Sequence, residues 1–182
     1  MTSPLDRMAA QAAATTGPGR PGLAQWQPPL SGDIDIRIDR DGNWYHEGTR
    51  IERHALVQLF ASILRREADG DHYLVTPVEK WRIRVDDAAL LVVDVDRVGS
   101  GEAQRIECVL NVGARVVVDA AHRLRVEYAA DGEPRPYLQL DHGLTARLLR
   151  SVYYRLVEWG RQHGEAWVID SAGQHFVLGR VD

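Results

Sequence analysis

The chain has 182 residues, of which 45% are hydrophobic and 26% are charged, as in ordinary globular proteins. The 26 acidic and 22 basic side chains give a formal net charge of −4, which argues against a dedicated nucleic-acid binder. The single cysteine, Cys108, excludes an intrachain disulfide framework and a zinc site built on several cysteines. No apolar run approaches the ~20 residues of a membrane span, and a lone thiol fits a reducing compartment, so we expect a cytoplasmic protein.

The first 24 residues predict a tail without regular structure. They are rich in Ala, Thr, Gly and Pro, and the run Gly17-Pro18-Gly19-Arg20-Pro21-Gly22 interrupts any helix or strand. Such a segment buries too little apolar surface to offset the entropy that is lost on ordering. We therefore expect a disordered tail over residues 1–24 and order from about Trp26 onward.

The next segment alternates between strand-like and helix-like patterns. Ile34, Ile36 and Ile38 alternate with charged residues, which predicts a strand with one buried face. An apolar stripe at helical spacing predicts a helix from about Arg53 to Glu67. Two further strands are expected at 73–76 and 80–85, with Pro77 at the break between them.

The second half of the chain predicts more strands and one more helix. Strands are expected at 90–98, 105–111, 115–119, 124–128 and 136–140. A second helix is predicted from about Thr145 to Trp159, and Gly160 after it suits a left-handed cap. Residues 167–170 and 175–178 then form a closing hairpin.

The order of these elements predicts an α+β fold of two small domains. Strands, a helix and a closing hairpin occur twice, first up to Asp87 and again up to Gly179, although no repeat of the sequence itself is visible. The strands are short and mostly joined by turns, which favours largely antiparallel sheets. We expect domains at 25–87 and 88–182, with the boundary near Asp86-Asp87-Ala88.

Catalytic and metal-binding motifs are scarce. The sequence has no phosphate-binding glycine loop, no HExxH pair and no GxSxG elbow. Asp119 with His122, and Asp141 with His142, could supply metal ligands or a general base, but polar residues are expected at such strand ends anyway. Cys108 lies on an apolar strand, which favours an inert core thiol. The sequence therefore predicts no metal, no cofactor and no catalytic residue.

The segment Thr76-Pro77-Val78-Glu79-Lys80-Trp81 is chemically distinct. Of the 22 basic residues only Lys80 is a lysine, although Arg serves everywhere else. Strand alternation places Glu79 and Trp81 on one face and Lys80 and Arg82 on the other. One interpretation is an anion-recognition edge, in which Lys80 contacts a phosphate or carboxylate and Thr76 adds a hydrogen bond. The other interpretation is an ion-paired hairpin corner.

Several short motifs occur in a fixed order between Trp26 and Gly179. They are Trp26-Gln27-Pro28-Pro29, Gly32-Asp33-Ile34-Asp35, Arg40-Asp41-Gly42-Asn43-Trp44, Leu56-Val57-Gln58-Leu59-Phe60-Ala61-Ser62, Thr76-Pro77-Val78-Glu79-Lys80, Pro136-Tyr137-Leu138 and Gly143-Leu144-Thr145-Ala146-Arg147. With these motifs the chain resembles an uncharacterised bacterial family, domain of unknown function 1285.

This resemblance implies a two-domain α+β fold with a duplicated motif, whose second domain is similar to a pleckstrin-homology-like barrel. It also implies a nucleotide-like ligand between the domains and a role in bacterial signal transduction. The chain matches the family's polar motif residues at a set of positions that we take as candidate ligand-binding residues. These are Thr76, Glu79, Lys80, Asn111, Tyr137 and Arg150.

The leading hypothesis is therefore a non-enzymatic ligand-binding or sensor protein. A small anionic ligand would pair with Lys80 in the cleft between the domains. Thr76 and Asn111 would donate hydrogen bonds to it, and Tyr137 would contact it with its ring.

Two alternatives come from other function classes. The first is a protein-interaction module, in which exposed strand edges accept a segment of a signalling partner. The second is a hydrolase that uses Glu79, Asp119 or His122 as a general base. No nucleic-acid or membrane partner is expected, and the helix faces could pack within one chain or across a homo-oligomer.

Overall fold

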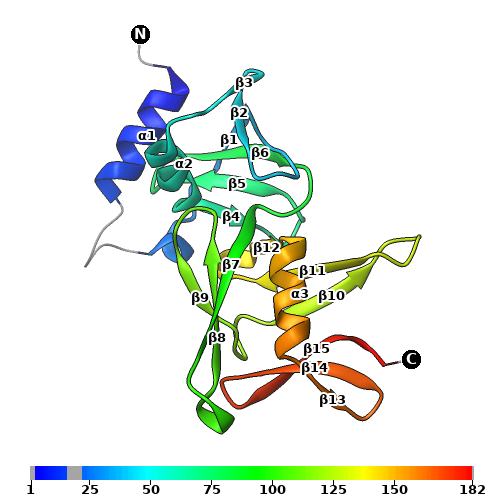
Figure 1. The fold of residues 1–182 in the computed structure, drawn as a ribbon. Helices are drawn as coiled ribbons and strands as arrows, with labels where there is room; N and C mark the ends of the chain where they lie inside the picture. Colours follow the sequence, from blue (N-terminus) through cyan, green and yellow to red (C-terminus); the bar gives the residue numbers. More distant parts are fainter. Residues whose placement is uncertain (1–2, 16–21, 182) are drawn as a thin grey trace. The chain divides into compact units, whose positions relative to one another are not determined.

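Two compact units make up the chain in the computed structural model, which describes residues 3–15 and 22–181. The first unit spans Met1–Asp87 and the second Ala88–Asp182 (Figure 1). Both units combine short helices with sheets that are mostly antiparallel, so the prediction of a two-domain α+β fold is confirmed.

The first unit is built on a six-stranded sheet with the strand order β3-β2-β1-β6-β5-β4. Its strands are β1 (Leu30–Ile38), β2 (Trp44–His46), β3 (Thr49–Arg50), β4 (Leu64–Arg66), β5 (His72–Val75) and β6 (Lys80–Val85). Among these described strands the central pair β1–β6 is parallel and the other pairs are antiparallel. Ile36 and Ile38 are both fully buried, as their alternation with charged residues predicts.

Helix α2 (His54–Ala61) is shorter than the helix predicted for 53–67. Its buried Phe60 stacks on Trp44, with the ring centroids 6.3 Å apart. Leu64 fits the helical stripe but also fits a strand, and it lies in β4, where it pairs with β5 and is fully buried. Because β5 satisfies the backbone groups of this segment, the strand is favoured and the prediction of helix beyond residue 61 is wrong.

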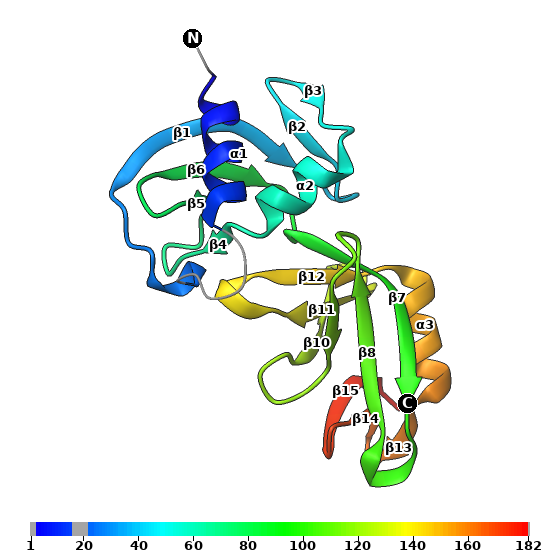
Figure 2. The same ribbon diagram turned by 90° about the vertical axis from the view of Figure 1, so that its left-hand side faces the viewer.

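A helix occupies part of the segment that was expected to be disordered. Helix α1 (Pro4–Thr15) begins next to Ser3, whose Oγ accepts a hydrogen bond from the Asp6 amide at 3.1 Å. Met8 and Ala12 are fully buried, and α1 packs beside α2 (Figure 2). This burial offsets the entropy cost that composition alone leaves uncompensated.

The disordered-tail prediction is therefore wrong for residues 3–15. It is also wrong for the start of the short 3₁₀ helix η1 (Leu23–Gln25), where Leu23 is buried. The rest of that prediction, at 1–2 and 16–21, lies outside the described residues.

The second unit contains another six-stranded sheet, with the strand order β10-β11-β12-β7-β8-β9. Its strands are β7 (Leu90–Val98), β8 (Arg105–Leu110), β9 (Arg115–Val117), β10 (Leu124–Tyr128), β11 (Pro134–Gln139) and β12 (Thr145–Leu148). Two 3₁₀ turns, η2 (Gly101–Ala103) and η3 (Asp141–Gly143), lie in its loops. Within the described residues no pairing joins the edge strands β9 and β10, so the barrel implied by the resemblance is not confirmed.

The two six-stranded sheets share one topology. In each, one antiparallel meander follows another, and the first strand of the first meander pairs in parallel with the last strand of the second. The helices do not follow this repeat, because α2 joins the two meanders of the first unit whereas a loop at 118–123 joins those of the second. The repeat in the sheets is therefore a double meander, and it differs from the predicted repeat of strands, a helix and a closing hairpin.

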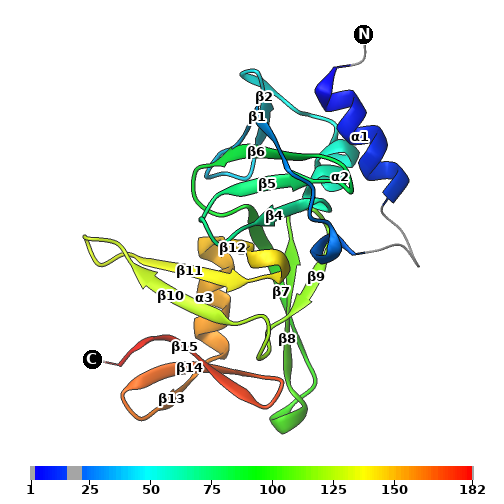
Figure 3. The ribbon, with the colours of Figure 1, turned by 180° about the vertical axis from the view of Figure 1, so that it is seen from behind.

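Helix α3 (Arg150–Trp159) follows the second sheet and is shorter than the helix predicted for 145–159. Residues 145–148 form β12 instead, because parallel pairing with β7 buries Leu148 and satisfies the backbone. A third sheet, of β13 (Arg161–His163), β14 (Ala166–Ser171) and β15 (Gln174–Arg180), follows α3 (Figure 3). None of the helices in the described ranges has the length and apolar character needed to cross a bilayer.

Gly160 ends α3 for a different reason than the predicted left-handed cap. Its backbone is extended, with φ −74° and ψ 172°. A Cβ at this position would lie 2.4 Å from Trp167 Nε1 and 2.9 Å from the Val168 carbonyl oxygen. The indole instead packs against the helix end and donates a hydrogen bond to the Val157 carbonyl at 2.8 Å. Close approach of the indole therefore requires glycine here.

Candidate functional site

The candidate ligand-binding residues are divided between the two units. Thr76, Glu79 and Lys80 lie in and beside the turn that joins β5 to β6. In the second unit, Tyr137 lies on β11, Arg150 begins α3, and Asn111 lies in the turn directly after β8.

Thr76 is a corner residue of the β5–β6 turn. Its side chain is fully buried, and its Oγ1 lies 2.8 Å from Gln11 Oε1 of α1. The same oxygen accepts a hydrogen bond from the Glu79 amide at 3.1 Å, and the Thr76 amide donates to the Glu79 carbonyl at 2.9 Å. These bonds close the turn around Pro77 and direct the hydroxyl into the first unit.

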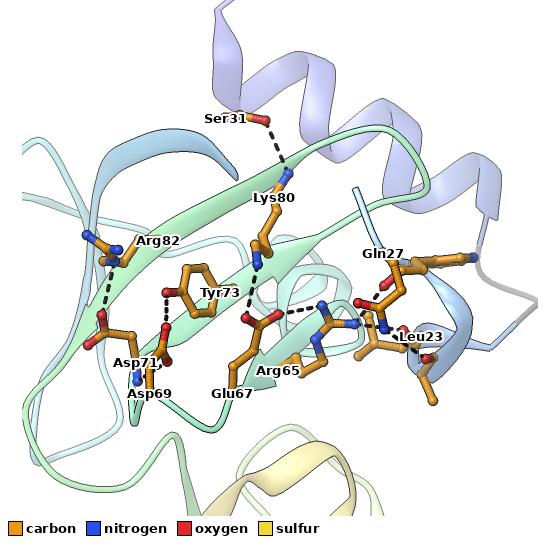
Figure 4. A network of polar contacts seen from close by, with 12 residues as sticks. Leu23, Gln27, Ser31, Arg65, Glu67, Asp69, Asp71, Tyr73, Lys80 and Arg82 are labelled. Atoms are coloured by element: carbon orange, nitrogen blue, oxygen red, sulfur yellow. Dashed lines mark hydrogen bonds and ion pairs between the residues drawn. The ribbon is translucent and has the colours of Figure 1, made fainter. Parts of the chain in front are cut away.

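Glu79, which directly precedes β6, and Lys80, its first residue, point to opposite faces, as alternation predicts. The Glu79 carboxylate accepts a hydrogen bond from Trp81 Nε1 at 3.2 Å on one face. On the other face, Lys80 Nζ pairs with Glu67 Oε2 at 3.0 Å and lies 4.8 Å from the centroid of the Tyr73 ring (Figure 4). The ammonium group is thus held at two points, and its side chain is only 18% exposed.

Arg65 shares the Glu67 carboxylate with Lys80. Its Nη2 contacts Glu67 Oε1 at 2.5 Å, and its Nη1 donates to the carbonyl oxygens of Leu23 and Trp26 at 3.2 and 2.8 Å (Figure 4). Burial opposes ionisation of Glu67, but the hydrogen bonds from Arg65 and Lys80 outweigh it and hold the pKa of this carboxyl below its usual value. Two cations and one carboxylate therefore form a mostly buried cluster.

Tyr73 is the centre of the same network. Its hydroxyl donates to Asp69 Oδ2 at 2.7 Å, and this bond raises the pKa of the Tyr73 phenol. Lys80 and the Arg82 guanidinium both lie over its ring, the latter at 5.8 Å. Arg82 also forms ion pairs with Asp33 at 3.3 Å and with Asp71 at 3.1 Å.

A cavity opens beside Arg82, where β1 separates from β6. The strand register passes from Asp33–Arg82 to Arg37–Arg84, so residues 34–36 of β1 face the single residue 83 of β6. The cavity measures about 350 Å³ and is lined by Asp33, Ile34, Asp35, Arg82, Ile83 and Arg84. Arg84 Nη2 pairs with Asp35 Oδ1 across it at 2.8 Å.

In the second unit, Asn111 and Tyr137 lie in one row across the sheet. The Asn111 amide donates to the Leu91 carbonyl at 2.9 Å, and its Oδ1 accepts from the Leu91 amide at 3.1 Å. Leu91 is opposite Arg147 of β12, which is opposite Tyr137 of β11. Arg125 of β10 lies on the other side of Tyr137, with its guanidinium 5.7 Å from the ring centroid.

Arg150 lies outside this row, at the start of α3. Its side chain is 72% exposed and reaches Tyr154, with Nε 3.0 Å from the hydroxyl oxygen. Its guanidinium lies 5.6 Å from the centroid of the Tyr154 ring and 3.9 Å from a carboxylate oxygen of Glu133. Of the candidate residues, Thr76 therefore contacts Glu79, and Asn111 lies in the same cross-strand row as Tyr137.

Asp119, His122 and Asp141, which the sequence offers for metal binding or base catalysis, contact one another. His122 lies between two carboxylates, with Nδ1 3.2 Å from Asp119 and Nε2 3.2 Å from Asp141. In the part of the chain that the structure describes, no group of His, Cys, Asp and Glu side chains is arranged to hold a metal ion. Cys108 is buried, and burial raises the pKa of its thiol to about 12.

Sequence reasoning missed Arg65, Glu67, Tyr73 and Arg125. The apolar stripe predicts the first two at the end of a helix, where their side chains would not face β5 and β6. A signal does exist, because the pattern Leu-Arg-x-Glu occurs at 64–67 and again at 124–127. The match is too short to be recognised in the sequence alone. It becomes informative because both segments lie on the first strand of the second meander of their sheet.

Both units of the chain are similar to known proteins. A family model described as the N-terminal domain of DUF1285, a domain of unknown function, matches residues 21–88, and the corresponding C-terminal domain model matches residues 89–178. The chain is similar to the crystal structure of a DUF1285 family protein from Silicibacter pomeroyi DSS-3, with 42% identity, coverage of 96% of this chain and 95% of that chain, and a TM-score of 0.86. It is also similar to a DUF1285 family protein from Shewanella baltica OS155, with 32% identity, coverage of 68% and 90%, and a TM-score of 0.54. No curated protein matches the chain.

Proposed function

The chain belongs to the DUF1285 family of unknown function, and we propose that it is a non-enzymatic binding protein for a small anionic, nucleotide-like ligand. The ligand binds along β6 of the first unit, where Lys80, Arg82 and Arg84 offer its anionic groups a row of cations. In a sensor of this kind, occupancy of the site is the input to a signalling response.

One observation carries this proposal. Lys80, Arg82 and Arg84 occupy alternate positions of β6, so their side chains share one face and are spaced about 7 Å apart along the strand. The β1 bulge opens a cavity of about 350 Å³ next to two of them. A strip of cations that borders a cavity suits a ligand with an anionic chain and an uncharged body.

The charge of the neighbouring cluster supports the same conclusion. Arg65 and Lys80 are 10% and 18% exposed, and both pair with the Glu67 carboxylate (Figure 4). An incoming phosphate or carboxylate would meet these two cations where solvent screening is weak, and it would compete with Glu67 and the nearby Asp69 for Lys80. Because Lys80 is already paired with Glu67, the ligand must compete with that carboxylate.

A thermal-shift titration tests the proposal. Wild-type protein is heated with nucleotides, cyclic dinucleotides and inorganic phosphate, beside the variants Lys80→Ala, Arg84→Ala and Arg115→Ala. A ligand that binds the folded state stabilises it by about 2.7 kcal/mol at 100 times its Kd. The matched control is Arg115, which pairs with Asp96 at 2.7 Å on the second unit much as Arg84 pairs with Asp35 at 2.8 Å.

We expect a concentration-dependent shift that Lys80→Ala and Arg84→Ala lose and Arg115→Ala keeps. A second prediction has the opposite sign: Glu67→Gln removes the competing carboxylate and should tighten binding. A shift of equal size in Lys80→Ala and wild type would rule out this site.

A second candidate function is a protein-interaction module. Tyr128 and Tyr154 are 56% and 48% exposed, and Arg150 stacks on the latter. Tyrosine and arginine are the side chains that most often dominate binding energy at protein interfaces. This function predicts a stoichiometric partner whose binding is lost in Tyr154→Ala, with no response to any small anion.

A further inference from the structure

A second cavity of the first unit lies between α1 and α2, which pack side by side in Figure 2. It measures about 260 Å³, and its walls are aliphatic. Helix α1 contributes Leu5 and Ala9, which are one helical turn apart, and α2 contributes Ala55, Leu56 and Leu59. These five side chains are half-buried or exposed, so the cavity is open to solvent.

The composition of α1 explains why space is left beside α2. Five of its twelve residues are alanines. Met8 and Ala12 are fully buried, one turn apart, and fix the helix against the first unit. Ala9 brings only a methyl group to the space that it shares with Leu56 and Leu59. A cavity with apolar walls and a solvent opening is the usual form of a small-molecule site.

Two opposite charges line the same cavity. Asp6 lies in the first turn of α1, and Arg53 directly precedes α2. Both side chains are exposed, and across residues 3–15 and 22–181 neither forms an ion pair. Asp6 Oδ2 accepts a hydrogen bond from the Ser3 hydroxyl at 2.9 Å, which leaves Oδ1 without one within these ranges. This part of the chain therefore offers the cavity one free carboxylate oxygen and one free guanidinium.

The size of the cavity limits what can bridge these charges. A sphere of 260 Å³ is about 8 Å across. A ligand whose ammonium and carboxylate are about 3 Å apart, each held by a charge-assisted hydrogen bond of about 2.8 Å, spans roughly the same distance. This spacing is that of the two groups when they are attached to one carbon atom. A lone carboxylate would satisfy Arg53 but be repelled by Asp6, and a lone amine would meet the reverse.

We propose that the cavity between α1 and α2 binds an aliphatic α-amino acid as the zwitterion. The ammonium pairs with Asp6 and the carboxylate with Arg53, while the side chain lies against Leu5, Leu56 and Leu59. The apolar walls favour leucine, isoleucine or valine over polar amino acids, because a polar side chain would lose its hydrogen bonds to water there. This site goes beyond the proposed function and shares no residue with the β6 site.

The probe for this site is L-leucine. It is titrated into the full-length protein with carbon-labelled leucine methyl groups, and the methyl resonances are followed by NMR. We expect saturable shifts at Leu5, Leu56 and Leu59. Glycine has both charged groups but buries no aliphatic side chain, so it should bind about tenfold more weakly or not at all.

Two analogues of leucine test the charged contacts separately. Isocaproate lacks the ammonium and isoamylamine lacks the carboxylate, and each should bind about tenfold more weakly than leucine. Asp6→Asn should weaken the binding of leucine about tenfold without weakening that of isocaproate. Arg53→Gln should weaken the binding of leucine equally without weakening that of isoamylamine. A merely structural role for either residue would weaken the binding of all three compounds alike.

A cavity-filling variant and matched controls separate binding from stability. Ala9→Leu places an isobutyl group in the cavity, so the folded variant should no longer bind leucine. Ala10→Leu adds the same side chain at an exposed position of the same helix and should bind leucine as the wild type does. Arg50→Gln, at an exposed arginine outside the cavity, should also bind leucine normally.

Three outcomes would overturn the inference. Absence of leucine-induced shifts at Leu56 and Leu59, with the folded spectrum intact, would show that the cavity takes no amino acid. Equal binding of leucine, isocaproate and isoamylamine would make it a general apolar groove instead. Unchanged binding in Ala9→Leu would place the bound leucine elsewhere. The reporting methyl groups lie on α1 and α2 rather than on β6, so failure here and failure of the β6 site are distinguishable.

Discussion

Tyr73 and Tyr137 hold equivalent positions in two sheets, each between two arginines and each followed by a leucine that is fully buried on the opposite face. The guanidinium of Arg82 lies 5.8 Å from the first ring centroid and that of Arg125 lies 5.7 Å from the second. The Tyr73 hydroxyl donates to Asp69 of the adjoining turn. The hairpin of Tyr137 is longer by two residue pairs, so the equivalent turn lies further from the tyrosine. One sheet design thus carries the same Arg-Tyr-Arg row in both units, with carboxylates of the adjoining turn on the row in the first unit.

The N-terminal helix should contribute measurably to the stability of the first unit. Met8 is fully buried, so Met8→Ala should reduce the free energy of unfolding by about 2–5 kcal/mol. Urea unfolding followed by circular dichroism measures the change. Arg7→Ala, at an exposed position of the same helix, is the control and should change stability little. Equal stability of Met8→Ala and wild type would contradict the packing of α1 against α2.

His72 should make the first unit less stable in mild acid. Burial, with Arg66 nearby, lowers the pKa of His72 from 6.5 to about 4. Between these values the unfolded chain binds a proton that the folded chain does not, so stability falls as pH drops through about 6.5 and levels off below about 4. The total effect is about 3 kcal/mol.

The measurement is urea unfolding across that pH window in wild type and His72→Gln. The variant should lose this part of the pH dependence, although carboxylates that titrate near the acid end will still contribute. His54→Gln, at an exposed histidine, should keep the wild-type slope. A wild-type slope in His72→Gln would mean that this imidazole is not the group responsible.

Gly160 should not tolerate even a methyl group. A Cβ there would meet the Trp167 indole at 2.4 Å, and the Val168 carbonyl at 2.9 Å prevents the backbone from yielding. We expect Gly160→Ala to lower stability by about 1–3 kcal/mol and to change Trp167 fluorescence. Gly22→Ala is the matched control, because its φ is −70° and nothing lies within 4 Å of the added Cβ. That variant should be neutral or slightly stabilising, and equal effects of both substitutions would refute the steric explanation.

Cys108 should be inert until the second unit unfolds. The side chain is fully buried and burial raises the pKa of the thiol to about 12, so neither access nor thiolate is available near neutral pH. Ellman's reagent should therefore label folded protein only at the rate of unfolding and react promptly in urea. Rapid labelling in the absence of denaturant would show that the strand carrying Cys108 opens locally.

Local patterns in the sequence determined several features by themselves. The alternation of Ile36 and Ile38 set the buried face of β1, and the alternation of Glu79 with Lys80 set the faces of β6, because side-chain direction in a strand has a fixed period of two. The same patterns predicted two α+β domains with mostly antiparallel sheets. The interpretation of residues 76–81 as an ion-paired hairpin corner agrees with the Lys80–Glu67 ion pair and with the turn that Thr76 and Glu79 close. These contacts leave the proposal of a ligand open.

Tertiary structure decided the remainder. Leu64 and Leu148 fit a helix or a strand, and only pairing with distant strands settled the choice. Lys80 and Glu67 are 13 residues apart, and Thr76 and Gln11 are 65 apart, so neither contact has a local signature. The Arg-Tyr-Arg rows are the clearest case, since hairpins of different length separate their members along the chain. Cross-strand register alone aligns them, because hydrogen bonding between strands fixes which residues stand opposite one another, whatever the length of the loop between them.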